Sequence, residues 1–297
     1  MMNQTNQAAL IATKFAAQAV GELYRDLGFV QRTNLWRTND IKENGNFEVP
    51  VIGQNLVAND RTGGGDTVDQ TPDAATIAVP LSEKHVAFPI DLNWYASENG
   101  QMTIMKNLDN AIKVLAKKVH KDMFETIATT AGLASTGTLG SALVLADWDF
   151  ARKTLVENEA NYGNFTALIS TTGMNDLKAI PQFAEYNTNG IAGIFSEGAV
   201  AKADNFAIFE TPRLYSPAAG QIVGIAADLM GVTTVFPKQK LFSSGENFKI
   251  EQEFDGVRFT ILQEYVPGKG GAWRWVVMAT YGCAVSDDRL VLKLNGR

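Results

Sequence analysis

The sequence has few of the residues on which most catalytic and metal sites depend. A single cysteine, Cys283, excludes an internal disulfide and leaves too few thiols for a structural zinc site. The two histidines, His85 and His120, fall in different predicted elements, and neither lies in a HExxH zinc motif. We therefore expect no metal, no cofactor and no catalytic residue, and interpret the chain as a protein that is not an enzyme. Paired glycosidase carboxylates depend on the fold and stay open at this point.

The sequence also lacks membrane and export signals. No apolar run approaches the ~20 residues that a membrane-spanning helix needs. The N-terminus lacks the basic start and apolar block of a signal peptide. We therefore expect no membrane partner, and the composition is compatible with the cytosol.

Positive charge is in the minority. Lys and Arg total 26 against 32 Asp and Glu, so the net charge is 26 − 32 = −6. An acidic chain argues against a dedicated nucleic-acid-binding protein, although it is compatible with a local basic patch. The 297 residues correspond to one large domain or two ordinary ones, and 45% are hydrophobic, which is enough for a substantial core.

A run of three glycines, Gly63, Gly64 and Gly65, lies in the segment "NDRTGGGDTVDQ" at residues 59–70. A phosphate-binding P-loop needs a Lys followed by Ser or Thr, and this segment has neither in place. Asp66 follows the glycines directly, and its negative charge would repel a phosphate. The glycines therefore indicate turn chemistry and not a nucleotide site.

Residues 46–92 are predicted to form one long β-hairpin around these glycines. Apolar residues alternate in the second arm, and Pro50, Pro80 and Pro89 interrupt the two arms. Because proline removes a hydrogen-bond donor, the arms are expected at a sheet edge and not in the middle of a wide sheet. A two-stranded hairpin alone is marginal in water, so we expect this one to rest on other protein.

Two helices are predicted in the first half of the chain, at residues 8–27 and 99–130. The second has apolar residues at three- and four-residue steps from Met105 to Ile127 and is far longer than an average helix. Its polar side carries a stripe of four lysines: Lys106, Lys113, Lys117 and Lys121. Such a stripe is more often a solvated face, and the functional alternative is a basic surface that faces a polyanion.

The remaining sequence predicts an α+β fold. Residues 131–145 form a small-residue connector, followed by a helix at 146–160, a strand at 165–170 and a short helix that ends before Pro181. From about residue 206 the pattern is mainly β, and the turn "PGKGGA" at 267–272 predicts a hairpin.

The order of these elements resembles the Hong Kong 97-type capsid fold of tailed-bacteriophage major capsid proteins, over essentially the whole chain. The stretches that carry the resemblance are "VAFPIDLNW" (86–94), "TALISTTGMNDLKAIPQF" (166–183), "GIAGIFSEGAVAKADNF" (190–206) and "VVMATYGCAVSDDRLVLKL" (276–294). They are patterns of apolar and turn residues, and the agreement in order and length is what supports the resemblance.

The resemblance implies a division of the chain into four parts. These are an N-terminal arm (1–45), an extended hairpin loop (46–92), a peripheral domain with the long spine helix (93–145 and 261–297) and an axial domain (146–260). The loop tip, with Arg61, Gly63, Gly64, Gly65 and Asp66, would contact a neighbouring subunit. The four lysines of the stripe would face DNA in the lumen.

The resemblance further implies a homo-oligomer of pentamers and hexamers in an icosahedral shell around packaged double-stranded DNA, contacted non-specifically. A portal and a decoration protein would be further partners. Many relatives carry an N-terminal scaffolding segment of about a hundred residues. Because the hairpin here begins near residue 46, we expect a separate scaffolding protein instead. The protein would assemble in the bacterial cytoplasm and belong to the virion.

Two alternatives stay open from the sequence. The first is an encapsulin-type nanocompartment shell, which has the same fold and a protein cargo. The second is a soluble hydrolase or nucleotide-binding enzyme, for which no motif in the sequence speaks.

Overall fold

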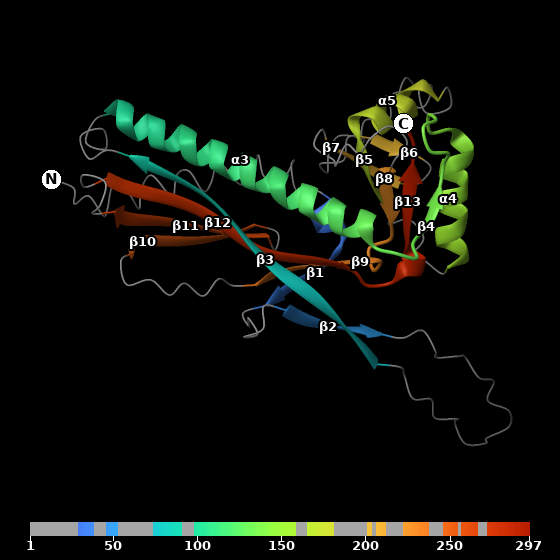
Figure 1. Ribbon diagram of the computed structural model, residues 1–297, viewed down its shortest axis with the longest axis horizontal. Coiled ribbons are helices and arrows are strands. Elements are labelled where there is room, and N and C mark those ends of the chain that lie inside the picture. The colour runs from blue at the N-terminus through green and yellow to red at the C-terminus, as the bar shows by residue number, and fades with distance from the viewer. Residues whose placement is uncertain are drawn as a thin grey trace, which may run out of the picture.

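The computed structural model describes eleven stretches of the chain: residues 29–38, 46–52, 74–90, 98–158, 165–180, 201–203, 206–211, 222–237, 246–254, 257–266 and 272–297. The described residues form two β-sheets and three α-helices, and the two sheets lie toward opposite ends of an elongated molecule (Figure 1). The helix expected at 8–27 lies outside the described residues. No helix in the described stretches has the length and apolarity needed to cross a membrane.

The larger sheet has seven strands: β1 (Asn34–Thr38), β2 (Asn46–Ile52), β3 (Ala74–Ile90), β9 (Val232–Pro237), β10 (Glu246–Phe254), β11 (Val257–Val266) and β12 (Ala272–Val285). Its main order is β1-β9-β12-β11-β10, with β3 beside β12 and β2 beside β3. β1 and β9 run parallel, and the other pairs are antiparallel. Val266 lies opposite Ala272, which confirms the hairpin predicted around "PGKGGA".

Strand β3 has two partners along its 17 residues. Its first part, residues 74–80, pairs with β2, and residues 81–90 pair with β12. The two-stranded hairpin is therefore confirmed, but only over 46–52 and 74–80. The prediction that the hairpin extends to residue 92 is wrong, because the backbone beyond Pro80 finds its hydrogen-bond partners in the large sheet.

The smaller sheet has six strands: β4 (Ala134–Thr136), β5 (Phe165–Ser170), β6 (Ala201–Ala203), β7 (Phe206–Thr211), β8 (Ile222–Ala227) and β13 (Val291–Asn295). Their order is β4-β13-β8-β5-β7-β6. Helices α4 (Leu145–Glu157) and α5 (Thr171–Ala179) pack on it and share one core cluster with it, which includes Trp148, Leu177 and Phe206. β5 is buried almost throughout, in keeping with the apolar residues at four of the six positions of its sequence, FTALIS. Two short 3-10 helices, η1 (Val30–Arg32) and η3 (Asp288–Leu290), complete the described elements.

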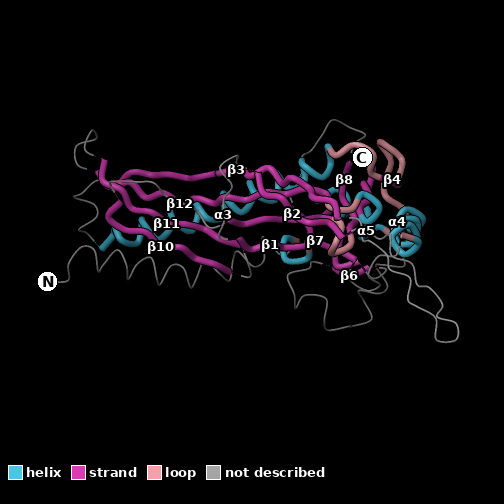
Figure 2. The backbone as a smooth tube through the Cα atoms, turned by 90° about the horizontal axis from the view of Figure 1, so that it is seen from below, coloured by secondary structure: helices cyan, strands magenta, loops and turns pink. Residues whose placement is uncertain are grey.

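Helix α3 (Glu98–Thr129) joins the two sheets. It lies along one face of the large sheet (Figures 1 and 2) and contacts β12, β3 and β8. One core cluster combines Leu108 and Val119 of α3 with Trp275 of the large sheet and Ile225 of the small sheet. The apolar repeat predicted from the sequence thus forms the buried face of a single helix, and that helix is shared by both sheets.

The two sheets do not follow the expected division of the sequence. β9 and β10, from the stretch 146–260, belong to the large sheet, whereas β4 and β13, from 93–145 and 261–297, belong to the small one. The assignment of peripheral and axial domains by residue number stays a prediction.

His120 should make the stability of the fold depend on pH. The side chain is buried on α3, and among the described residues its Nε2 has no hydrogen-bond partner. Burial lowers its pKa from 6.5 to about 4. The unfolded chain therefore binds more protons between these values, and stability is lost as the pH falls from about 6.5 toward 4. From pH 7.5 to pH 5, we expect the free energy of unfolding to fall by about 2 kcal/mol through this group.

Urea unfolding of the unassembled chain at the two pH values measures this effect. His120→Gln should remove the contribution of about 2 kcal/mol, whereas His85→Gln should keep it, because His85 is exposed on β3. An equal pH dependence in both variants would contradict the assignment to His120.

Candidate assembly surfaces

The base of the hairpin is fixed to the large sheet. Val49 and Val79, from β2 and β3, are buried against Val235 of β9. The rings of Trp36 in β1 and Phe47 in β2 lie next to them, with centroids 6.4 Å apart. These contacts involve the same residues that pair β2 with β3. The hairpin therefore leaves the large sheet with its direction set by a packed apolar base.

The tip of the hairpin lies outside the described residues. Ile52 pairs with Ala74 at the last described position of the two arms. Arg61, the glycines at 63–65 and Asp66 lie between them, so their contact with a neighbouring subunit stays a prediction.

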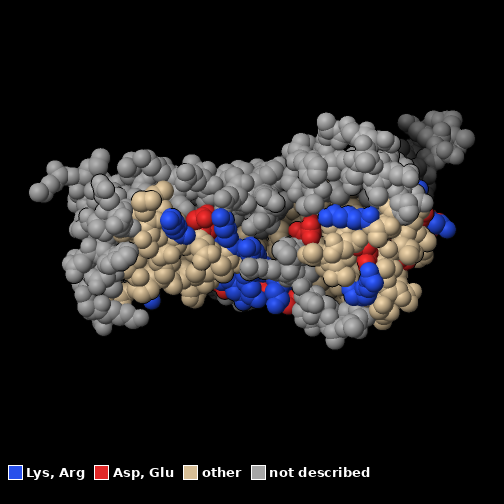
Figure 3. All heavy atoms as spheres, turned by 90° about the horizontal axis from the view of Figure 1, so that it is seen from above, with Lys and Arg blue, Asp and Glu red and all other residues tan. Residues whose placement is uncertain are grey.

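Lys106, Lys113 and Lys117 lie on the side of α3 opposite its buried residues Ile104, Leu108 and Leu115. Further along the helix the lysine side is itself buried, at His120 and Phe124. Lys113 pairs with Asp109 at 2.8 Å, and Lys121 pairs with Glu125 at 3.6 Å. Lys106 and Lys117 have no ion-pair partner in the described part of the chain. Figure 3 views the molecule from the α3 side and shows Lys and Arg side chains along this face, with acidic side chains between several of them. The stripe is thus less basic than its lysines alone suggest.

A polar link connects α3 to β12 beside the stripe. Asp122 accepts hydrogen bonds from Lys118 Nζ and from the Tyr281 hydroxyl, each at 2.5 Å. The bond to Asp122 is the main reason that the pKa of Lys118 is raised. Burial is the main cause that raises the pKa of Tyr281, and the hydrogen bond to Asp122 is the second cause. Lys118 and Asp122 both lie on α3, so the charge-assisted bond from Tyr281 is the one that holds this turn of the helix against β12.

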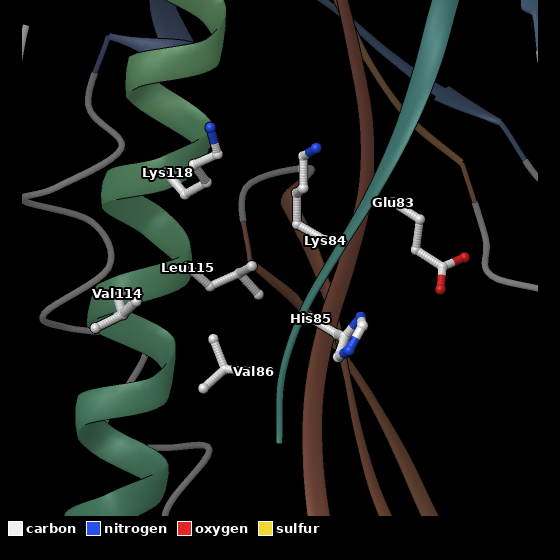
Figure 4. A pocket seen from close by; sticks show the side chains of 7 residues that line it. All are labelled: Glu83, Lys84, His85, Val86, Val114, Leu115 and Lys118. Carbon is white, nitrogen blue, oxygen red and sulfur yellow. The ribbon is translucent and has the colours of Figure 1, made fainter. Parts of the chain in front are cut away.

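A pocket of about 370 Å³ lies between α3 and β3. Its walls are four consecutive β3 residues, Glu83–Val86, and Val114, Leu115 and Lys118 of α3 (Figure 4). Sequence reasoning missed it, since Lys84 and Lys118 belong to different elements and only the fold brings them together. Lys118 directly follows Lys117 of the lysine stripe in the sequence, whereas no sequence signal pointed to Lys84.

The described residues hold little that resembles an active site. Burial raises the pKa of the Cys283 thiol to about 12, so it stays protonated and is a poor nucleophile at neutral pH. No group of three or more His, Cys, Asp or Glu side chains in the described stretches is arranged to bind a metal ion.

Comparison with known proteins identifies the fold. Neither a protein-family model nor a curated protein matches the sequence. Solved structures do match, and three of them are representative. The capsid of a native GTA particle is 12% identical with a TM-score of 0.58, and the match covers 91% of this chain and 90% of that one.

The virus-like particle from Pyrococcus furiosus is 11% identical with a TM-score of 0.58, covering 95% of this chain and 98% of that one. The capsid of cyanophage P-SCSP1u is 13% identical with a TM-score of 0.55, covering 91% and 88%. At such identities the likeness establishes the fold. The prediction of an α+β capsid-type fold is therefore confirmed.

Proposed function

We propose that this chain is the structural subunit that assembles into the icosahedral head shell of a tailed phage and encloses its packaged double-stranded DNA. The observation that carries the proposal is the shared fold over about nine tenths of both chains in structures of capsids and particles. The hairpin supports the proposal independently. Where β2 pairs with β3, the arm has two strands and projects beyond the rest of the large sheet (Figure 1), and a two-stranded arm is marginal in water unless it rests on another protein surface. The role is structural and not enzymatic.

Within the shell, the subunits form pentamers and hexamers, and the hairpin tip at 53–73 lies on a neighbouring subunit. The division into arm, extended loop, peripheral domain and axial domain belongs to this proposal. So do a portal, a separate scaffolding protein and a decoration protein as partners, and assembly in the cytoplasm of the host.

Electron microscopy tests the proposal directly. The chain is expressed with its scaffolding protein, or the virion is purified, and the particles are imaged. We expect closed icosahedral shells in which this chain is the most abundant protein. Monomers or small closed rings under every condition would refute the proposal.

A shell around a protein cargo is the second candidate. The match to the virus-like particle, which covers 98% of that chain, fits a shell of this fold and does not say what the shell contains. The contents of purified particles separate the two functions. Nuclease-protected DNA supports the phage head, and a co-purifying protein cargo without DNA supports the nanocompartment.

The unpaired lysines of the stripe should dominate its contact with DNA. Lys106→Gln with Lys117→Gln should lower the slope of log binding constant against log salt concentration by about 1.8, since each phosphate contact contributes roughly 0.9. The measurement is fluorescence anisotropy with a duplex oligonucleotide and the unassembled chain. Lys153→Gln with Lys178→Gln, on α4 and α5, is the charge-matched control. Equal slopes in the two double variants would exclude a special role for the stripe.

A further inference from the structure

The pocket between α3 and β3 follows an open strand edge. In the described part of the chain, residues 81–90 of β3 pair with β12 alone. Side chains of consecutive strand residues point to opposite faces, yet Glu83, Lys84, His85 and Val86 all line the pocket. A pocket that reaches both faces of a strand must run along its edge, where unpaired backbone N–H and C=O groups are accessible. Such an edge is a template for one more strand.

The same pocket selects for an acidic strand. Val86, Val114 and Leu115 give it an apolar floor. Figure 4 shows Lys84 and Lys118 on one side of the pocket, whereas Glu83 points away across β3. An incoming segment is therefore favoured if it combines an apolar side chain with carboxylates.

One segment of this chain has that composition. Residues 53–73 hold four aspartates and one arginine, a net charge of 1 − 4 = −3. No other stretch outside the described residues has so negative a net charge. Within it, Asp66 and Asp69 flank Val68 closely.

The segment cannot reach the pocket of its own chain. Ala74 and Glu83 are nine residues apart in one continuous strand, which is about 30 Å. Val68 is six residues from Ala74, and even a fully extended chain spans only about 22 Å over that length. A second copy must therefore provide the occupant.

We infer that the pocket between α3 and β3 receives residues 66–69 of a second copy as an added strand. Val68 packs against the apolar floor, and the carboxylates of Asp66 and Asp69 face Lys84 and Lys118, of which Lys118 keeps its bond to Asp122. This inference rests on the proposed assembly, and it names the surface that takes the hairpin tip.

Disulfide trapping tests the contact in assembled particles. Asp69→Cys with Lys84→Cys should give covalent multimers after mild oxidation, seen on a non-reducing gel. Asp69→Cys with Lys153→Cys, on the exposed face of α4, is the control. The native Cys283 stays in both, because it is buried. Particles in which the first pair cross-links no more than the control would overturn the inference while leaving the shell function intact.

A binding experiment decides the question even if no particles form. A fluorescein-labelled peptide of residues 59–73 should bind the unassembled chain, and Lys84→Glu should weaken binding by about tenfold or more. Lys153→Glu should leave it unchanged. Absence of peptide binding by the parent chain would overturn the inference. The inference would also be overturned if Lys84→Glu weakened binding of a duplex oligonucleotide while the parent chain did not bind the peptide. The pocket lysines would then bind nucleic acid and not the hairpin tip.

Discussion

Gly137→Ala should destabilise the subunit by about 3 kcal/mol or more, at least twice the effect of Gly132→Ala. Both glycines have positive φ angles, +84° and +83°, where an alanine costs roughly 1–2 kcal/mol. Only Gly137 is also crowded, since an added Cβ would lie 2.3 Å from the backbone oxygen of Asn295. That oxygen belongs to β13, so relieving the clash means shifting a strand, which adds roughly 1–3 kcal/mol.

Gly132→Ala is the matched control, because nothing lies within 4 Å of its added Cβ. Urea unfolding of the two unassembled variants measures both effects on one scale. Equal losses of stability would show that backbone conformation alone matters, and that β4 and β13 do not need to approach as closely as the structure has them.

Deleting residues 55–71 should abolish particle formation while the subunit stays folded. The apolar base of the hairpin, with Phe47, Val49 and Val79, lies outside the deleted stretch, and so does the pairing of Ile52 with Ala74. The free energy of unfolding should therefore change by no more than about 0.5 kcal/mol. Electron microscopy should show no shells, because the arm no longer reaches a neighbour. Shells of normal yield and heat stability would contradict the proposed contact.

Two variants that keep the length of the hairpin tip separate the effect of its length from the effect of its side chains. A tip of equal length made only of Gly and Ser keeps the reach and loses Arg61 and Asp66, and we expect it to impair assembly. Gly64→Val tests the glycines alone, and we expect fewer particles or particles that break at a lower temperature. If the Gly64→Val particle survives heating like its parent, the glycines have no special role.

Local elements of the fold could be predicted because their signals are local. The three- and four-residue apolar spacing predicted a helix at 99–130, and α3 spans Glu98–Thr129. The strand predicted at 165–170 is β5, with the same bounds. Each of these stretches carries its full signal within its own residues, as a helical period in the first case and a mainly apolar run in the second.

Strand pairing over long distances could not be predicted in the same way. The connector expected at 131–145 contains β4, which pairs in parallel with β13 near the other end of the chain. Three residues are too short for a periodic signal, and the partner's position appears nowhere in the local sequence. The same reason explains why the second hairpin arm was expected to run on past Pro80, when residues 81–90 join β12.

Of the candidate surfaces, one could be predicted from local sequence and one could not. The lysine stripe was predicted from helical spacing, and the i to i+4 pair of Asp109 with Lys113 follows from the same spacing. The pocket was beyond prediction, because Lys84 and Lys118 meet only when β3 packs beside α3. The spacing of residues within one helix can therefore predict a surface on that helix, whereas a surface formed by two elements depends on how they pack.

The position of β12 in the large sheet also makes that sheet form late during synthesis of the chain. β12 pairs with β3, β9 and β11, yet its residues 272–285 follow all three of these strands in the sequence. Until β12 has been made, residues 81–90 of β3 have no sheet partner among the described strands, and the base of the hairpin lacks Ala284 of β12. A nascent chain that stops before β12 therefore has neither a finished hairpin base nor a paired β3 beside the pocket, the two features on which the proposed contact between subunits depends.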